Sequence, residues 1–463
     1  MDIHIHVKTV FNMAAIWAKR ALLADGWADD VTIRLDADGR IAGMQKGSPA
    51  EGHRVDLLVP APANSHSHAF QRAMAGLTER RGAGDDSFWT WRTLMYRFID
   101  RMTPEQVQAI AAFVQMEMLE AGFAANTEFH YLHHAPGGQP YDNIAEMSAR
   151  IAAAAEQSGI GLTLLPVMYQ FGGCDGRPLA GGQLRFGNDP DRFARLVEGA
   201  RAAIAPLPDA RLGVAPHSLR AVARGDFAPL TALTDGPIHM HLAEQIPEVT
   251  EVQAAYGARP IEWALDNLDL GPRWCLIHLT QMLPHETLAL AATGAVAGLC
   301  PLTEASLGDG IFDGVRWMGA GGAISLGSDS NIRISLAEEL RQLDTSQRLR
   351  DHSRAALATA DLSTGRRLIE ASAKGGAQAA GRGQGVIAPG EWADLMALDM
   401  AHPDLEGLSP DTALDSFAFA GDSGMVADVW AAGRHMVQGG RHVARDAITD
   451  AYRHAVRDLR AGV

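Results

Sequence analysis

The sequence predicts an α/β protein in which eight strands alternate with helices and close into a barrel. Between about residues 57 and 375, short apolar runs alternate with alanine-rich stretches of helical composition, which is the pattern of βα units on a parallel sheet. Eight runs are expected to be strands: 57–61, 125–130, 162–168, 212–217, 238–242, 274–278, 295–300 and 323–329. Polar residues gather at the ends of these runs, where a (β/α)8 TIM barrel carries its chemistry.

The two ends of the chain have the pattern of short strands and turns. Residues 31–35 and 39–43 are strand-like runs joined by the turn sequence Asp-Ala-Asp-Gly, which is typical of a hairpin. Similar segments occur at 385–399 and 426–434, so both ends are expected to share a small sheet. The expected organisation is an N-terminal part of this small domain at 1–56, the barrel at 57–375, and a C-terminal part with a terminal helix at 376–463.

Composition and charge exclude several classes of protein. The chain has 463 residues, of which 47% are hydrophobic and 21% charged, so we expect an ordinary globular protein. A formal net charge of -15 makes nucleic acid an unexpected partner. Three cysteines are too few for a disulfide framework, and no uncharged apolar run approaches the length of a membrane span. Because the beginning lacks the apolar core of a signal peptide, the expected compartment is the cytoplasm.

Two histidines at the end of the first expected strand indicate a metal site. His66 and His68 are two residues apart, and because strand side chains alternate, both lie on one face. Further polar residues follow the fifth, sixth and eighth strands: His241, Glu244, His278 and Asp329. Three imidazoles and one carboxylate suit a borderline ion such as zinc, and a water can complete the coordination.

The sequence alone leaves alternatives open at these positions. His239 shares a strand face with His241, and we favour His241 because Glu244 then lies beside the water on the metal. His278 could instead be a buried structural histidine, and Asp329 could cap a helix. A second His-x-His pair, at positions 4 and 6, precedes every expected barrel strand and is more simply part of an alternating strand.

Five motifs resemble the amidohydrolase superfamily, in its branch of mononuclear deaminases. They are HSHAFQRAMAGL at 66–77, SFWTWR at 87–92, EFHY at 128–131, HLAEQ at 241–245 and LGDG at 307–310. Together they resemble, within that superfamily, the formimidoylglutamate deiminases of histidine breakdown. The resemblance covers nearly the whole chain and implies that the terminal sheets form a composite β-sandwich. In one departure, the His-Ala-Thr-His run of the family is His-Leu-Thr-Gln at 278–281.

The resemblance implies a reaction and the residues that perform it. The reaction is zinc-dependent hydrolysis of N-formimino-L-glutamate to N-formyl-L-glutamate and ammonia, with one Zn2+ or another divalent ion per chain; a homodimer is expected. The implied metal ligands are His66, His68, His241 and Asp329. The implied catalytic residues are Glu244, His278 and Asp329. The implied contacts to the dicarboxylate substrate come from Gln71, Arg92, Tyr131, His217 and Arg220.

Lysine positions bear on the number of metals. Binuclear members of this superfamily bridge two metals with a carboxylated lysine, whereas all four lysines here lie outside the expected barrel strands, at positions 8, 19, 46 and 374. A lysine-bridged pair is therefore excluded. One metal suits a deamination, because a single activated water has to attack one sp2 carbon.

Two other functions remain compatible with these motifs. A related deaminase or chlorohydrolase would act on a flat heterocycle such as guanine or a triazine, and its pocket would need stacking aromatic rings more than two arginines. A protein without catalysis could use the metal as a sensor or scaffold, although Glu244 and His278 are both present. The aromatic-rich segment around Arg92, at 80–98, could be a lid or a dimer interface.

Overall fold

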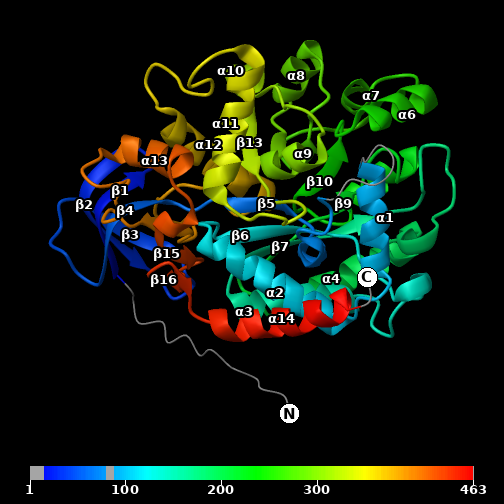
Figure 1. The fold of residues 1–463 in the computed structure, drawn as a ribbon, viewed down its shortest axis with the longest axis horizontal. Coiled ribbons are helices and arrows are strands. Elements are labelled where there is room, and N and C mark those ends of the chain that lie inside the picture. The colour runs from blue at the N-terminus through cyan, green and yellow to red at the C-terminus, as the bar shows by residue number, and fades with distance from the viewer. Residues whose placement is uncertain (1–14, 80–87, 462–463) are drawn as a thin grey trace.

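The computed structural model describes residues 15–79 and 88–461, without the side chains of 88–93. Its centre is a set of parallel strands (Figure 1). They are β5 (Ala63–Ser67), β6 (Ala125–His130), β7 (Gly161–Met168), β8 (Arg211–Leu212) with β9 (Ala215–Pro216), β10 (Ile238–Leu242), β11 (Trp274–His278), β12 (Val296–Leu299) and β13 (Ala323–Leu326). The pairing order is β10-β11-β12-β13-β5-β6-β7-β8, and a parallel bridge from Val214 to Ile238 closes the ring. The predicted barrel is confirmed.

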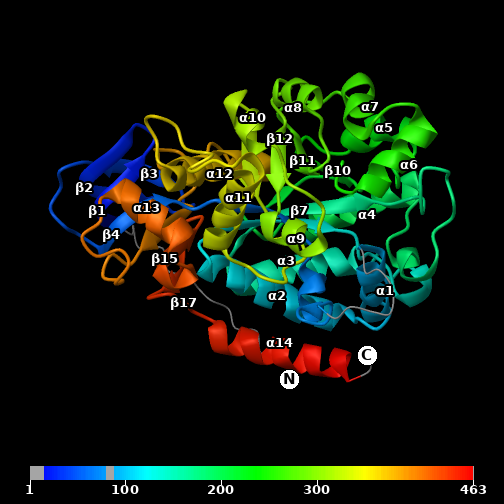
Figure 2. The same cartoon turned by 45° about the horizontal axis from the view of Figure 1, so that its top comes forward.

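Helices cover the outside of this ring, as the two views in Figures 1 and 2 show. They are α1 (Phe88–Ile99), α2 (Pro104–Glu120), α3 (Glu146–Ser158), α4 (Pro190–Ile204), α5 (Phe227–Thr231), α6 (Ile246–Tyr256), α7 (Pro260–Asn267), α8 (Pro284–Ala291), α9 (Pro301–Leu307), α10 (Gly314–Gly319), α11 (Leu336–Asp351) and α12 (Thr364–Ala380). Several begin with proline, for example Pro104 and Pro190. Proline is favoured there because the first turn of a helix needs no N–H donor.

The prediction that residues 57–61 form the first barrel strand is wrong. These residues belong to β4 (His53–Pro60), which pairs with β1 (Ala15–Leu23) and β14 (Leu395–Leu398) in the small sheet. The first barrel strand is β5. A short apolar run indicates a buried strand but not its partners, and here two such runs follow each other. The change of sheet therefore falls between Pro60 and Ala63 rather than at residue 57.

The expected fourth strand, 212–217, is interrupted in the structure. It forms the two short segments β8 and β9, with Gly213 and Val214 between them. A Cβ atom at Gly213 would lie 2.3 Å from the carbonyl oxygen of Pro237. Only glycine allows this close approach, and the interruption brings Val214 against β10 to complete the barrel.

Strands from both chain ends form one mixed eight-stranded sheet, in the order β17-β16-β15-β14-β4-β1-β2-β3. The strands not yet given are β2 (Gly26–Leu35), β3 (Ile41–Gln45), β15 (Val426–Ala431), β16 (Arg434–Gln438) and β17 (Arg441–His442). The predicted turn at 36–39 joins β2 to β3, where the Asp36 carboxylate accepts hydrogen bonds from the N–H groups of Asp38 and Arg40. This sheet has a hydrophobic core of its own, which includes Ile33 and Leu58, and the composite small domain is confirmed.

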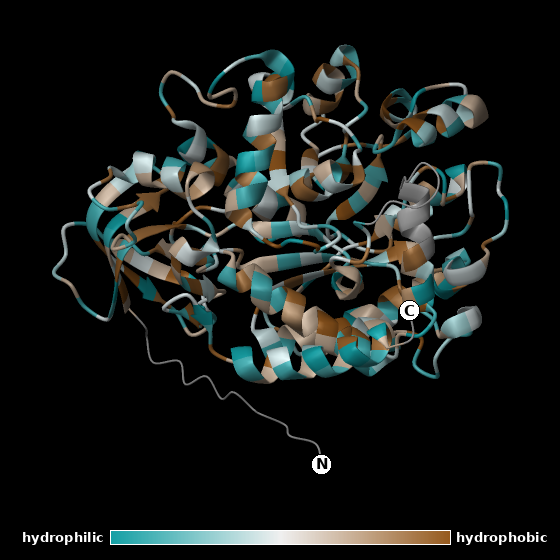
Figure 3. Cartoon of the chain, viewed as in Figure 1, coloured by the Kyte–Doolittle hydropathy of each residue, from teal (hydrophilic) through white to brown (hydrophobic). Residues whose placement is uncertain are grey.

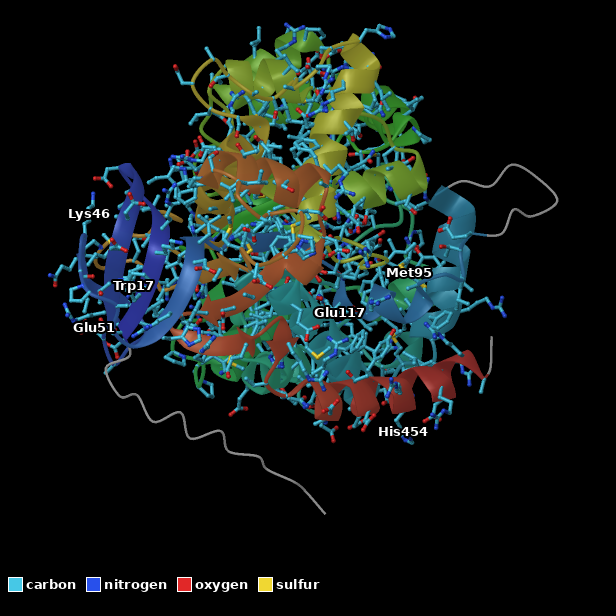
Figure 4. All side chains as sticks on the ribbon, turned by 60° about the vertical axis from the view of Figure 1, so that its left-hand side comes forward. Trp17, Lys46, Glu51, Met95, Glu117 and His454 are labelled. Atoms are coloured by element: carbon cyan, nitrogen blue, oxygen red, sulfur yellow. The ribbon has the colours of Figure 1, made fainter. Side chains whose placement is uncertain are left out.

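The small sheet lies beside the barrel, and Figure 4 shows Trp17, Lys46 and Glu51 on it, away from Met95 on α1. The predicted terminal helix is α14 (Arg445–Arg460), which follows α13 (Pro410–Phe419) and β15 to β17. Its buried residues recur at helical spacing, as at Ile448, Tyr452 and Val456. The Tyr452 ring stacks on Phe113 of α2 at 3.9 Å. Figure 3 shows the polar side of this helix facing outward at the bottom of the molecule.

No helix in the described part of the chain is long and apolar enough to cross a membrane.

A buried ion network joins the barrel to the small sheet. Arg382, directly after α12, is almost fully buried and lies 3.1 Å from the carboxylates of both Asp209 and Asp394. Arg434 of β16 reaches the same Asp209 at 2.8 Å. Gly161 makes room for this cluster, because a Cβ atom there would lie 2.6 Å from Cζ of Arg382. The guanidinium is therefore enclosed and fully paired.

We predict that Arg382→Met lowers the free energy of unfolding by about 3–5 kcal/mol, because removal of one partner leaves buried carboxylates unpaired. Urea denaturation followed by circular dichroism measures the change. The control is Arg20→Met, which removes an exposed pair with Asp29 in the small sheet and should cost no more than about 1 kcal/mol. Equal midpoints for the two variants would show that the buried network does not hold the domains together.

Candidate active site and metal centre

Side chains from four barrel strands meet at the carboxyl edge of the barrel. They are His66 of β5 and His68 just after it, His241 of β10, His278 at the end of β11 and Asp329 after β13. All five are buried. Because parallel strands in a closed barrel end on the same side, residues more than 250 positions apart come together there.

The distances among these donors suit a tetrahedral metal ion. Nε2 of His66 lies 3.1 Å from Nε2 of His241 and 3.5 Å from Oδ1 of Asp329. Nε2 of His68 lies 3.3 Å from the same carboxylate oxygen. Ligand atoms about 2.0–2.1 Å from a tetrahedral zinc lie about 3.3 Å from one another. The cluster therefore has the spacing of a ligand set.

The ring nitrogens facing the centre carry lone pairs. Nδ1 of His68 lies 3.0 Å from the Phe129 carbonyl, and Nδ1 of His241 lies 3.2 Å from the His217 carbonyl. Each Nδ1 must therefore donate its proton outward, which leaves Nε2 free to bind a metal. Burial lowers the pKa of His66 to about 3 and that of His241 well below its usual value, so these imidazoles are neutral.

Asp329 completes the set as an anion. Burial opposes ionisation, but the hydrogen bond with His66 and the nearby imidazoles hold the pKa of Asp329 well below its usual value. Converging lone pairs around a buried carboxylate are stable only with a cation among them. The residues present thus fit the metal that the sequence predicts.

His239 is placed away from this centre. Its Nε2 lies 2.8 Å from the Ala379 carbonyl near the end of α12. His241, two residues later, lies against His66. The structure therefore brings His241 and not His239 into the cluster.

A second group of ionisable residues lies next to the cluster. Nε2 of His278 is 3.8 Å from both Oε1 of Glu244 and Oδ2 of Asp329, and its Nδ1 is 3.3 Å from Oε1 of Glu304. Burial disfavours the imidazolium, but the surrounding carboxylates outweigh it and raise the pKa of His278 to about 10. Burial also raises the pKa of Glu244 to about 7. Glu244 can therefore gain and lose a proton near neutrality.

The backbone at these strand ends is strained. Left-handed φ values occur at three non-glycine residues of the site: 52° at Ala243, 75° at His278 and 45° at Asp329. Such conformations persist only where the surrounding structure enforces them. At Asp329 the enforcement is visible, because its N–H and carbonyl bond to the backbone of His66 and His68, each at 2.9 Å.

The predicted substrate residues line a cavity above this cluster. Gln71, Tyr131, His217 and Arg220 all face it, together with Glu244, His68, His241 and Asp329. Nε2 of Gln71 donates to the Tyr131 hydroxyl at 2.8 Å. Nε of Arg220 is buried and has no hydrogen-bond partner among the described residues. Arg92 lies on α1, and its side chain is outside the part that the structure describes.

The site also contains residues that the sequence reading missed. Glu304 contacts His278, and Asp309 accepts a hydrogen bond from the side chain of Gln245. Burial raises the pKa of Asp309 to about 9. Met95, Tyr169 and Phe186 line the cavity. Glu304 follows the end of the seventh barrel strand, β12. The expectation that functional polar residues lie just past strand ends could therefore also have identified it.

The fold and this cluster define a member of the amidohydrolase family. The chain belongs to that family, whose sequence pattern matches residues 57–436. Residues 13–54 match the pattern described as the N-terminal domain of formimidoylglutamate deiminase. The chain is 45% identical to the formimidoylglutamate deiminase of Pseudomonas aeruginosa, over 96% of this chain and 100% of that one. It is 27% identical to a 5-methylthioadenosine/S-adenosylhomocysteine deaminase of Natronomonas pharaonis, over 95% and 91%.

Solved structures agree with this assignment. An amidohydrolase from Brucella melitensis superposes with a TM-score of 0.93 at 48% identity, over 96% of this chain and 99% of that one. Atrazine chlorohydrolase from Arthrobacter aurescens, complexed with zinc, shares the fold with a TM-score of 0.82 at 19% identity, over 96% and 100%. The buried His/Asp cluster is typical of a metal site in this family.

We predict that His241→Ala abolishes tight metal binding and that His239→Ala does not. The two histidines lie on the same strand, but only His241 faces the cluster. The measurement is metal content by plasma emission after gel filtration, with circular dichroism to verify folding. Loss of metal from His239→Ala, with retention in His241→Ala, would reverse the assignment.

Proposed function

We propose that this protein hydrolyses N-formimino-L-glutamate to N-formyl-L-glutamate and ammonia, a step of histidine degradation. The observation that carries the proposal is the full-length similarity to a formimidoylglutamate deiminase, which includes the N-terminal domain. The site supports it independently. The cavity beside the candidate metal ligands contains Arg220, whose buried Nε lacks a hydrogen-bond partner among the described residues. An anionic substrate group would supply that partner.

One zinc ion per chain is proposed at the cluster, held by His66, His68, His241 and Asp329; another divalent ion could replace it. When bound, zinc lowers the pKa of a water from about 15.7 to about 7 and so supplies a nucleophile at neutral pH. The support is the donor spacing and the neutral state of the imidazoles.

Two side chains transfer protons and a third stabilises charge. Oδ2 of Asp329 takes a proton from the attacking water and, because its pKa is held low, passes it on so that it ends on the departing nitrogen. Glu244, with its pKa near 7, protonates the imino nitrogen so that ammonia departs rather than amide ion. The His278 imidazolium stabilises the negative charge that develops on the oxygen. Water adds to the formimino carbon, the C–N bond to the terminal nitrogen breaks, and a formyl group remains.

The two substrate carboxylates are proposed to bind the polar side chains that line the cavity beside the cluster. Arg220 offers a guanidinium fork for one of them, and Gln71, Tyr131 and His217 offer neutral or switchable donors. We assign Arg92 to the second carboxylate on the resemblance alone. This arrangement favours an acyclic dicarboxylate over a neutral heterocycle, because the latter would leave the buried Nε of Arg220 without a hydrogen-bond partner.

Compartment and assembly are part of the same proposal. All three cysteines carry free thiols, which agrees with a cytoplasmic enzyme. The homodimer rests on the resemblance, and sedimentation equilibrium measures it directly.

We predict ammonia release from N-formimino-L-glutamate at a kcat/KM far above that for guanine or for the diamide of the substrate. A coupled ammonia assay with the purified protein measures all three. Equal rates for guanine would favour a heterocycle deaminase, and no metal-dependent ammonia release from any of them would favour a sensor or scaffold.

We predict that Glu244→Gln keeps the metal and the fold but lowers kcat by about 10²–10⁴-fold, because an amide cannot pass a proton. The matched control is Glu251→Gln on α6, whose carboxylate instead bonds to the loop at Cys174 and Arg177. Near-normal turnover of Glu244→Gln would show that another residue donates the proton.

We predict that Arg220→Met lowers kcat/KM for the dicarboxylate by about 30-fold or more, since loss of a buried charged contact costs about 2–5 kcal/mol. Metal content should not change. Arg224→Met is the control, because Arg224 lies four residues later at the surface, stacked on Tyr256. A similar loss of kcat/KM for the neutral diamide would show that Arg220 does not recognise the substrate by its negative charge.

A further inference from the structure

A second group of metal-ligating side chains lies in the small sheet, outside the catalytic cavity. His53 is the first residue of β4, Asp428 lies on β15 and His435 lies on β16. Each offers one ligand atom within reach of the other two. None of the three lines the cavity around Glu244 and Asp329.

The two imidazoles converge on one carboxylate oxygen. Oδ1 of Asp428 lies 3.3 Å from Nε2 of His53 and 2.6 Å from Nε2 of His435. The first distance equals the spacing of about 3.3 Å between two ligands of a tetrahedral ion, and the second needs a shift of less than 1 Å. Both imidazoles thus direct the same nitrogen toward the same acceptor.

Neighbouring aromatic rings hold these imidazoles in position. The His435 ring stacks on Trp430 with centroids 4.3 Å apart and an angle of 13° between planes. His53 packs edge-on against both Trp430 and His435, at 5.5 and 4.6 Å. Trp430 itself is buried in the core of the small sheet. The orientation of the ligand atoms is therefore set by packing, which reduces the entropy lost when an ion binds.

The cluster is open on one side. The side chain of His53 is 43% exposed, whereas those of His435 and Asp428 are 21% and 11% exposed. An ion can enter from solvent, and water can fill the remaining coordination position. Two imidazoles and one carboxylate select borderline transition metals over Mg²⁺ and Ca²⁺, which prefer oxygen ligands.

We propose that His53, Asp428 and His435 form a second site for a divalent transition metal of the zinc and copper class, weaker than the catalytic centre. An ion bound there joins the N-terminal strand β4 to the C-terminal strands β15 and β16. It stabilises the folded small domain by binding that state preferentially.

The test uses the zinc-loaded full-length enzyme and one added equivalent of Cu²⁺ as probe. We expect an electron paramagnetic resonance spectrum with hyperfine coupling to two imidazole nitrogens, while emission analysis shows that the catalytic zinc is retained. Single variants His53→Ala and His435→Ala should each lose one coupled nitrogen and weaken binding about tenfold or more. The rate of ammonia release before copper is added should stay at the wild-type value in both.

His285→Ala is the matched control, because His285 is also an exposed histidine beside a carboxylate, 3.1 Å from Glu262. It should leave the copper spectrum unchanged. Zinc titration by calorimetry provides the second measurement, with one additional zinc per chain expected in the wild type and none in the double variant His53→Ala/His435→Ala. A wild-type spectrum in that double variant, or no additional bound metal in the wild type, would overturn the proposal.

Discussion

Two backbone hydrogen bonds between the ends of β5 and β13 determine the geometry of the site. The N–H of Asp329 donates to the carbonyl of His66, and the N–H of His68 donates to the carbonyl of Asp329. They join the barrel's first strand to its last, and they hold Asp329 in a left-handed conformation. Its carboxylate thereby reaches the Nε2 atoms of both histidines. Without these bonds, nothing in the local sequence would bring Asp329 to His66, because the two residues lie more than 250 positions apart in the chain.

The same junction between strands concentrates charge among buried side chains. The buried imidazoles of His66 and His241 stay neutral, the carboxylate of Asp329 stays ionised, and the carboxylates around His278 favour its protonated form. These opposite shifts come from one environment, because each group responds both to burial and to its nearest charge. The separation of the proposed ligand, acid and cation roles would therefore be an electrostatic consequence of how the strand ends are placed. Glu304 takes part in it by contacting the far side of His278.

The small domain is attached to the barrel by buried ion pairs. Its strands come from both chain ends, and a buried network around Arg382 attaches it to the barrel. Neither terminal segment can complete the eight-stranded sheet alone, because β4 pairs with both β1 and β14. The composite sheet thus requires strands from both ends of the chain. This arrangement also places His53 beside Asp428 and His435, far apart in sequence.

Local patterns in the sequence determined much of this protein. Alternation of side chains put His66 and His68 on one face, apolar runs identified the barrel strands, and polar residues at their ends identified most of the cluster. Such signals depend only on neighbours along the chain. Three outcomes needed the tertiary structure: β4 joined the small sheet, His239 turned toward α12, and Glu304 reached His278. Each depends on which distant strand or helix packs alongside, and the periodicity of a single segment is the same whichever partner it meets.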